Sequence, residues 1–467
     1  DIMERKYAWH EYTDADTQAM EALCKDYRDF LDNGKTEREC IEQTIAKAEA
    51  VGYKNLKDLL TAGQPIKAGD KVYAVHMNKI IALFNIGTDS LEQGFNILGA
   101  HIDSPRLDVK QNPFYEDKNL AFFDTHYYGG IKKYQWVAMP LALHGVIVKK
   151  DGTKVTLSIG EKDTDPVFCV TDLLPHLGQE QMEKKAAKVI EGENLDLLIG
   201  SQPVKGELKE GVTKFLNDIF EKEYGFTEED LLSAELEIVP AGRAREMGFD
   251  RSMILAYGQD DRVCAYTSLA AMLEVDKVKR TTCTLLVDKE EIGSVGATGM
   301  QSRWFENMVA ELLAMAGEKS PLAVRRTLER SRMLSSDVSA GFDPLYASAF
   351  EAKNAAFLGK GVVFNKFTGA RGKSGSNDAN AEYMGFIRRI MDDNKVNFQT
   401  AELGKVDLGG GGTIAYIMAL YGMNVIDCGV AVLSMHAPWE VTSKADVYEA
   451  KKCYVAFLKA DSAESGL

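Results

Sequence analysis

The chain has 467 residues, 45% of them hydrophobic and 27% charged, and this ordinary globular composition excludes a collagen-like fibre and a mainly disordered chain. Its 55 Lys and Arg residues against 70 Asp and Glu residues give a net charge of −15, so the chain as a whole does not attract nucleic acid or an anionic membrane surface. Seven well-separated cysteines without a CxxC pair indicate a reduced intracellular protein. No run reaches the ~18 apolar residues of a membrane span. We therefore expect a cytoplasmic protein with neither nucleic-acid nor membrane partners.

The predicted elements alternate between helices and short buried strands. Two helices come first, at residues 16–31 and 36–50. Apolar runs that resemble strands covered on both faces follow at 95–100, 282–287 and 425–433. Further helical patterns lie at 262–275, 304–316, 381–391, 413–421 and 445–460. This alternation predicts an α/β domain whose ligand sites lie beyond the carboxyl ends of the strands.

The middle of the chain has a different pattern. Residues 146–148 and 155–159 predict a hairpin with an Asp151-Gly152 turn. Because 467 residues exceed what one hydrophobic core usually supports, more than one domain is expected. We predict a first, α/β domain of residues 1–107 plus 241–467, interrupted by a β-rich domain of residues 108–240.

Histidines and carboxylates follow several of the strand-like runs. His101 and Asp103 share one face of extended backbone, which suits a metal-binding imidazole that a carboxylate holds in place. Asp260-Asp261 follows another run, although a helix N-cap alone would also explain this pair. Glu290-Glu291 is an adjacent acidic pair that needs a cation or a shared proton when buried. A hydrolase can use one such Glu as a metal ligand and the other as a base.

Asp337 and His436 complete a set of histidines and carboxylates without thiolates, which suits Zn²⁺, Co²⁺ or Mn²⁺. Two glycine-rich segments are competing candidates for a site. Residues 369–374 resemble a phosphate-binding loop, but Phe367 stands where a P-loop requires its first glycine. Residues 409–412 are four glycines that predict either a tight turn or a backbone edge for substrate, through Gly410 and Gly411.

Taken together, these motifs resemble the aspartyl aminopeptidase/vacuolar aminopeptidase I family of dinuclear metallo-aminopeptidases, and most closely its bacterial aminopeptidase 1 branch. The matching stretches are GAHIDSPRLDV at 99–109, QDDRVCAY at 259–266, DKEEIGSVGATG at 288–299, SSDVSAG at 335–341, GGGGTIA at 409–415 and SMHAPWE at 434–440. They extend over most of the chain, and their order and combination are specific to the family.

The resemblance implies a zinc-exopeptidase-like α/β fold with an inserted oligomerisation domain. It also implies two divalent metal ions per chain, most simply Zn²⁺. One metal would be held by His101, Asp260 and Asp337, and the other by Asp260, Glu291 and His436. Glu290 would be the general base for a hydroxide that bridges the metals, and Asp103 would orient His101.

The family assembles into tetrahedral dodecamers, so the resemblance implies a homo-oligomer of this kind. Its inserted domain supplies a histidine to a neighbouring active site, and His176 lies in the matching segment. Lys366, with Arg371 and Lys373, could pair with an acidic first residue of the substrate, or the three could form a solvated basic loop. Departures from the family pattern within residues 364–383 leave open whether that first residue is acidic or Leu-like.

The activity predicted is the removal of single N-terminal residues from peptides with free N-termini. Two alternatives stay open. A metal-dependent deacylase or carboxypeptidase could use the same ligands, and blocked-amine substrates would distinguish it. A binding protein could also keep the site in vestigial form.

Overall fold

The computed structural model describes residues 5–461, which divide into two compact units. The first contains the chain up to Asp103, Arg245–Met435 and the chain from Glu440 onward. The second contains Ser104–Ala244 and the short segment His436–Trp439. Within residues 5–461, no helix is long and apolar enough to cross a membrane.

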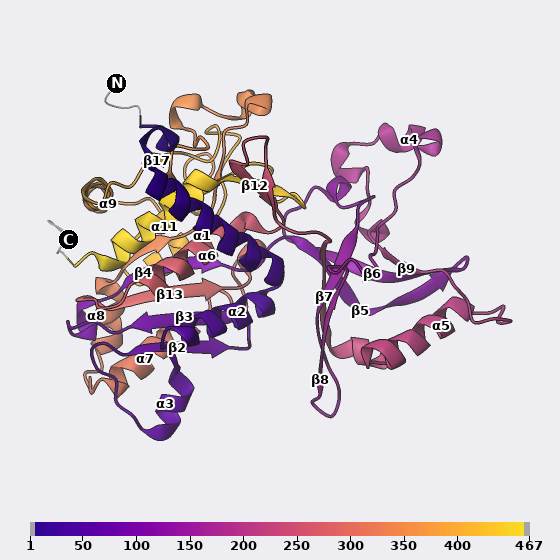
Figure 1. Cartoon of the computed structure of the whole chain (residues 1–467), viewed down its shortest axis with the longest axis horizontal. Helices are drawn as coiled ribbons and strands as arrows, with labels where there is room; N and C mark the ends of the chain where they lie inside the picture. The colour runs from indigo at the N-terminus through magenta and orange to yellow at the C-terminus, as the bar shows by residue number, and fades with distance from the viewer. Residues whose placement is uncertain (1–4, 462–467) are drawn as a thin grey trace. The chain divides into compact units, whose positions relative to one another are not determined.

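A nine-stranded mixed sheet forms the centre of the first unit (Figure 1). Its strand order is β1-β2-β3-β13-β4-β14-β18-β16-β17. The strands are β1 (Lys54–Asn55), β2 (Lys71–His76), β3 (Ile80–Asn85), β4 (Asn96–His101), β13 (Thr282–Val287), β14 (Arg332–Ser335), β16 (Val362–Asn365), β17 (Phe398–Thr400) and β18 (Asn424–Gly429). Neighbours β13, β4, β14 and β18 run parallel, so their carboxyl ends meet at one edge of the sheet.

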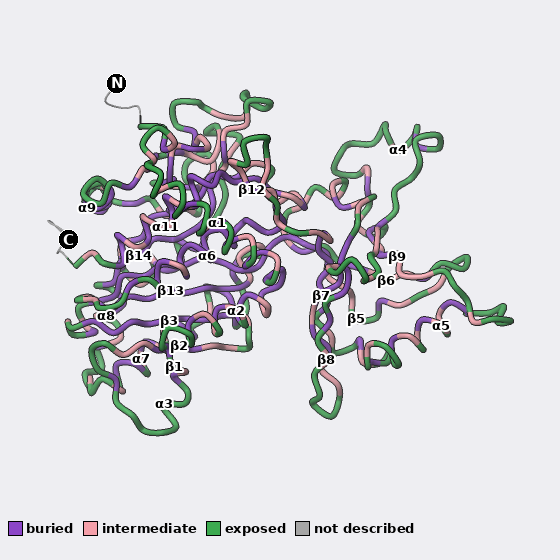
Figure 2. Tube along the Cα trace, in the orientation of Figure 1, coloured by how far each residue is buried: buried purple, intermediate pink, exposed green. Residues whose placement is uncertain are grey.

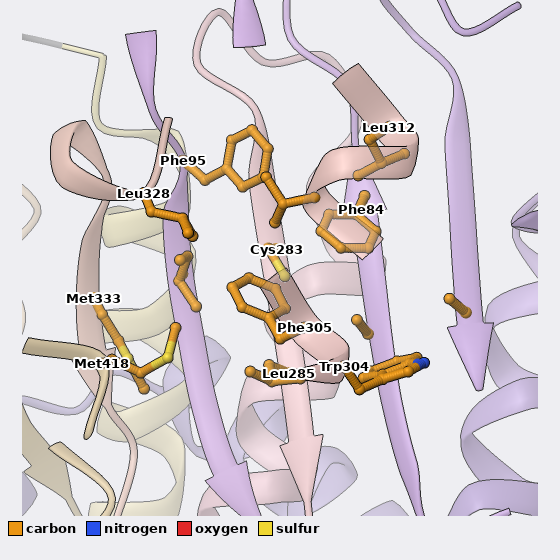
Figure 3. Close-up of a cluster of buried hydrophobic side chains, with 14 of the residues drawn as sticks. Phe84, Phe95, Cys283, Leu285, Trp304, Phe305, Leu312, Leu328, Met333 and Met418 are labelled. Carbon is orange, nitrogen blue, oxygen red and sulfur yellow. The ribbon is translucent and has the colours of Figure 1, made fainter. Parts of the chain in front are cut away.

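Helices pack on both faces of this sheet. They are α1 (Asp14–Asn33), α2 (Glu37–Ala50), α3 (Leu56–Ala62), α6 (Gln259–Glu274), α7 (Trp304–Met315), α8 (Ala323–Arg330), α9 (Ala381–Asp393), α10 (Ala415–Ala419) and α11 (Lys444–Lys459). Figure 3 shows Phe84 and Cys283 of the strands in one hydrophobic cluster with Phe305 and Leu312 of α7. On the other face, the side chain of Asn96 donates to the Phe457 carbonyl of α11 at 3.2 Å.

Two covered faces explain why the strand sequences are apolar along their whole length instead of alternating. Strands β3, β13 and β14 are buried at every position (Figure 2). Smaller sheets complete the unit: β11 (Arg245–Met247), β12 (Met253–Ala256) and β20 (Glu440–Ser443) form one, and β15 (Ser339–Ala340) pairs with β19 (Ala431–Val432).

The second unit is built on a six-stranded antiparallel sheet of order β8-β7-β10-β5-β6-β9. The strands are β5 (Arg106–Asp117), β6 (Leu120–Tyr128), β7 (Leu141–Val148), β8 (Lys154–Ile159), β9 (Leu197–Gly200) and β10 (Ala234–Pro240). Its helices are α4 (Gln179–Met182) and α5 (Gly211–Ile219). An apolar cavity of about 810 Å³ is lined by residues of this sheet and of α5, among them Phe123, Leu143 and Leu216.

The α/β fold predicted from the sequence is confirmed, and most helices begin and end within two or three residues of their predicted bounds. The predicted hairpin is formed by β7 and β8, with the amide of Gly152 donating to Lys149 O at 2.9 Å in its turn. The prediction of one strand over residues 425–433 is wrong. The run divides into β18, which joins the central sheet, and β19, which pairs with β15.

Candidate metal centre

The candidate site lies where the parallel strands of the first unit end. His101 is the last residue of β4 and pairs in register with Val287, the last residue of β13. Two residues beyond β14 comes Asp337, and Glu290–Ile292 form a short 3-10 helix just after β13. Adjacent parallel strands therefore bring an imidazole and three carboxylates to one edge, as expected for an α/β sheet.

Four carboxylates surround the outer nitrogen of His101, whose side chain is only 1% exposed. From His101 Nε2 the distances are 3.1 Å to Asp260 Oδ1, 3.5 Å to Glu290 Oε2, 3.6 Å to Asp337 Oδ1 and 3.9 Å to Glu291 Oε1. His101, Asp260 and Asp337 are all buried, and their ligand atoms lie close enough together to hold one metal ion. Carboxylates crowded in a buried place repel one another unless a cation compensates them, so this donor set fits a divalent metal.

The pKa values show the same excess of negative charge. Burial raises the pKa of Glu290 to about 8, and Asp337, Asp260 and Asp103 add to this effect against the opposing influence of His101. Burial likewise raises the pKa of Asp337. For His101, burial lowers the pKa, but the effect of Glu290 and the other carboxylates is larger. The pKa of His101 therefore lies well above its usual value. The raised pKa of Glu290 thus reflects the uncompensated negative charge of the cluster, which a bound cation would offset.

Asp103 connects His101 to the acidic pair Glu290-Glu291. Its Oδ1 lies 3.1 Å from His101 Nδ1, and its carboxylate accepts the backbone amides of Glu290 at 3.2 Å and Glu291 at 3.0 Å. Burial would raise the pKa of Asp103, but the bond with His101 outweighs it, so the pKa lies below its usual range. A charged Asp103 therefore fixes both the imidazole and the acidic pair.

The two members of Asp260-Asp261 have different surroundings, a difference that the N-cap interpretation did not anticipate. They precede the regular part of α6, and the peptide bond between them is cis. Asp260 faces His101 Nε2, whereas Asp261 Oδ2 accepts the backbone amide of His101 at 3.2 Å. The amide of Asp260 donates to Glu440 Oε1 of β20 at 3.0 Å. Glu440 was given no role from the sequence, although it ends the matching stretch at 434–440.

Two of the predicted site histidines belong to the second unit. His436 opens its segment His436–Trp439, and its Nδ1 lies 2.8 Å from the Gly130 carbonyl. His176 is an exposed residue in the short 3-10 helix Pro175–Leu177. The first unit thus brings together six of the predicted residues, namely His101, Asp103, Asp260, Glu290, Glu291 and Asp337.

Apart from His176, the residues predicted to contact substrate lie on loops of the first unit. Lys366 directly follows β16, and its ammonium group is bonded to Asp378. The amide of Gly411 donates to Thr368 O at 2.8 Å, and Gly410 has a φ of +110° that favours glycine. The segment 369–374 is a turn, and α9 begins only at Ala381, so the helix that follows strand and loop in a P-loop is lacking here.

Comparisons with known proteins show the family to which the chain belongs. A family model described as aminopeptidase I zinc metalloprotease (M18) matches residues 30–458. The probable M18 family aminopeptidase 1 of Clostridium acetobutylicum is 60% identical over 458 residues, which cover 98% of both chains. The crystal structure of aminopeptidase I from the same organism superposes with a TM-score of 0.92, covering 98% of this chain and 99% of that one. An M18 aminopeptidase structure from Thermotoga maritima, 44% identical, gives a TM-score of 0.93 over 98% of this chain and 99% of that one.

Proposed function

Because the chain belongs to the aminopeptidase I (M18) family of zinc metalloproteases, and is a metal-dependent aminopeptidase, we propose that it releases single N-terminal residues with Glu290 as its general base. The observation that carries this proposal is the convergence of Asp260, Glu290, Glu291 and Asp337 on Nε2 of the buried His101. A proton-accepting Glu beside a buried set of metal-ligand side chains is what a hydrolytic metal centre requires.

The metal-binding part of the proposal names two sites. His101, Asp260 and Asp337 would hold one divalent ion, and the buried cluster that they form supports this assignment. Asp260, Glu291 and His436 would hold the second, with Asp260 shared, and here the support is the family resemblance. Zn²⁺ suits these ligands, with Co²⁺ or Mn²⁺ as alternatives. Bound divalent ions polarise the scissile carbonyl and lower the pKa of a nearby water.

Glu290 would take the proton of the attacking water and return it to the leaving amine. The position of Glu290 supports both steps, because its Oε2 lies 3.5 Å from His101 Nε2 among the candidate metal ligands, where a carboxylate can exchange a proton with an attacking water. Asp103 would keep Glu290 and His101 in position through the three bonds that it accepts or shares. Lys366, Gly410, Gly411 and, from a neighbouring copy, His176 would contact the substrate.

A test separates metal binding from proton transfer. Glu290→Gln should retain the wild-type metal content, measured by elemental mass spectrometry, while kcat falls ~10²–10⁴-fold because the proton acceptor is lost. Asp260→Ala should lose most of the metal and is the matched control. Near-normal turnover of Glu290→Gln would contradict the assignment. N-acetylated peptides should not be cleaved, and their rapid cleavage would favour a deacylase instead.

The proposal also covers assembly and location: a cytoplasmic, tetrahedral homododecamer formed through the second unit. The exposed apolar side chains of Leu173, Leu174 and Leu177 in this unit support the proposal, because exposed apolar patches usually mark interaction sites. Sedimentation should give about twelve times the chain mass of 51.6 kDa. A monomeric mass at micromolar concentration would reject the dodecamer without affecting the proposed chemistry.

A further inference from the structure

The second unit contains an apolar cavity of about 810 Å³ that the proposed hydrolysis does not use. This volume lies within the range of ~300–1,000 Å³ that is usual for small-molecule binding sites. All the residues that line the cavity fall between Leu120 and Phe226, so a single unit builds it. Water forms few hydrogen bonds in a space with apolar walls, and such spaces bind apolar molecules instead. The cavity is therefore a candidate ligand site.

One wall of the cavity is formed by strands β7 and β8. Leu143 of β7 pairs in register with Ile159 of β8, and Leu157 comes two residues before Ile159. These three side chains therefore share one face of the sheet, and all three line the cavity. Leu143 and Leu157 are each 4% exposed and Ile159 is 7% exposed. Because a single chain already buries them, the cavity is a deep pocket that needs no second copy to form it.

A second wall is formed by α5, which packs on β5 and β6 (Figure 1), and by the helical turn Phe220–Tyr224 that continues it. Leu216, Ile219 and Phe220 line the cavity, and their spacing of three and four residues places them on one side of the helix. The Phe220 ring packs against the ring of Phe123 in β6, with the centroids 6.0 Å apart. The helix is thus fixed to β6, and the cavity occupies the space between the helix and the apolar side chains of β7 and β8.

The polar groups of the cavity determine which apolar ligand fits. Its lining includes Ser201, Glu223 and Tyr224, but within residues 5–461 no Lys, Arg or His lines it. Burial and the carboxylate of Glu223 raise the pKa of Tyr224, so these two side chains are neighbours, and Glu223 is exposed to solvent at the entrance. A ligand carboxylate would meet a like charge there without a cationic partner. An ammonium or hydroxyl group would instead donate a hydrogen bond to Glu223.

From this arrangement we propose that the cavity binds an aliphatic amine or alcohol. The hydrocarbon chain of the ligand lies between Leu143 and Leu216, and its amine or hydroxyl group donates to the carboxylate of Glu223. This site goes beyond the proposed aminopeptidase function and does not depend on it, because every group that it uses belongs to the second unit.

Three probes with the same ten-carbon chain test the proposal: decylamine, 1-decanol and decanoate. Their affinities for the full-length protein are measured below the concentrations at which they form micelles, by displacement of the uncharged fluorophore N-phenyl-1-naphthylamine. Decylamine should bind at least tenfold more tightly than decanoate, because only the amine forms a charged hydrogen bond with Glu223. Octylamine should bind about tenfold more weakly than decylamine, because two fewer methylene groups are buried.

Two substitutions separate the head group from the chain. Glu223→Gln should abolish the preference for decylamine over decanoate and leave the affinity for 1-decanol within about twofold of the wild type. Glu221→Gln is the matched control, because Glu221 is exposed and lies outside the cavity lining. It removes the same charge, so it accounts for the general attraction of amines to a chain of net charge −15. Ile219→Trp should fill the cavity and weaken all three probes at least tenfold, whereas Leu232→Trp, at a 58% exposed position outside the lining, should weaken none.

Three results would each overturn the proposal. The wild type could fail to bind the fluorophore and the probes, as it would if a second copy of the chain filled the cavity. It could bind decanoate as tightly as decylamine, or Ile219→Trp could bind all three probes as the wild type does. If Ile219→Trp does not fold, the comparison of Glu223→Gln with Glu221→Gln still decides. Probe binding that survives removal of metal by a chelator would confirm that the site is independent of the proposed metal centre.

Discussion

At the scale of single residues, Asp103 shows how one buried carboxylate organises several others. It is fully buried, and it holds His101 from one side and the amides of Glu290 and Glu291 from the other. The strand that supplies His101 and the loop that supplies the acidic pair are thereby joined at a single side chain. The sequence predicted the contact with His101 from i, i+2 spacing, but not the contacts with the two amides, because they join segments 187 and 188 residues apart.

Asp103→Asn should weaken metal binding about 10–100-fold while leaving the fold intact. Asparagine offers one acceptor oxygen in place of two, so it cannot hold the imidazole and both amides as the carboxylate does. Competition with a chelator of known affinity would measure the change. Asp276→Asn is the control, since the side chain of Asp276 is exposed and forms an ion pair with Lys71 at 3.0 Å. Wild-type metal affinity in Asp103→Asn would show that the imidazole and the acidic pair need no such support.

At the scale of secondary-structure elements, close strand packing fixes the ligands that follow the strands. Gly429 ends β18 beside the residues after β14, and a Cβ added there would lie 1.9 Å from the Asp337 carbonyl oxygen. Any side chain at this position would therefore displace the backbone of Asp337. Glu440 acts similarly from β20, where it accepts the amide of Asp260. The positions of the candidate ligands thus depend on neighbouring strands as much as on their own.

The bounds of most of these strands and helices were predictable, because they depend on residues close together in the sequence. The run 282–287 became β13 with the predicted bounds, since its apolar sequence is bounded by polar residues on both sides. Pairing between distant strands was not predictable. The strand before Asp260, β12, belongs to a small sheet with β11 and β20, and β16 runs antiparallel to β18. The counter-ion of Lys366 was missed as well, because it lies twelve residues away across a turn.

At the scale of the whole molecule, a buried carboxylate of the first unit forms hydrogen bonds that link segments far apart in the sequence. Asp446 lies in the first turn of α11 and accepts the amides of Gly359 at 2.9 Å and Gly361 at 2.8 Å. The Gly359 carbonyl in turn accepts the amide of Ala8 at 2.8 Å. Segments near both ends of the chain therefore meet at the loop that precedes β16. Unfolding of this unit must expose Asp446 to water.

The pH dependence of stability should reveal this group. Burial raises the pKa of Asp446 from 3.8 to about 7, against the opposing bonds from Gly359 and Gly361. The folded state thus binds the proton of Asp446 more tightly than the unfolded state does. The stabilisation of the folded state by this proton is complete below pH 4 and is lost as the pH rises through 7. Relative to Asp446→Asn, the free energy of unfolding of the wild type should fall by about 3 kcal/mol between pH 5 and 8. Urea unfolding at several pH values would measure the difference, with Asp393→Asn on the exposed side of α9 as the control. The difference in the free energy of unfolding between the wild type and Asp446→Asn could instead be independent of pH or grow with pH. Either result would mean that Asp446 is charged throughout and that its two hydrogen bonds from backbone amides compensate for burial.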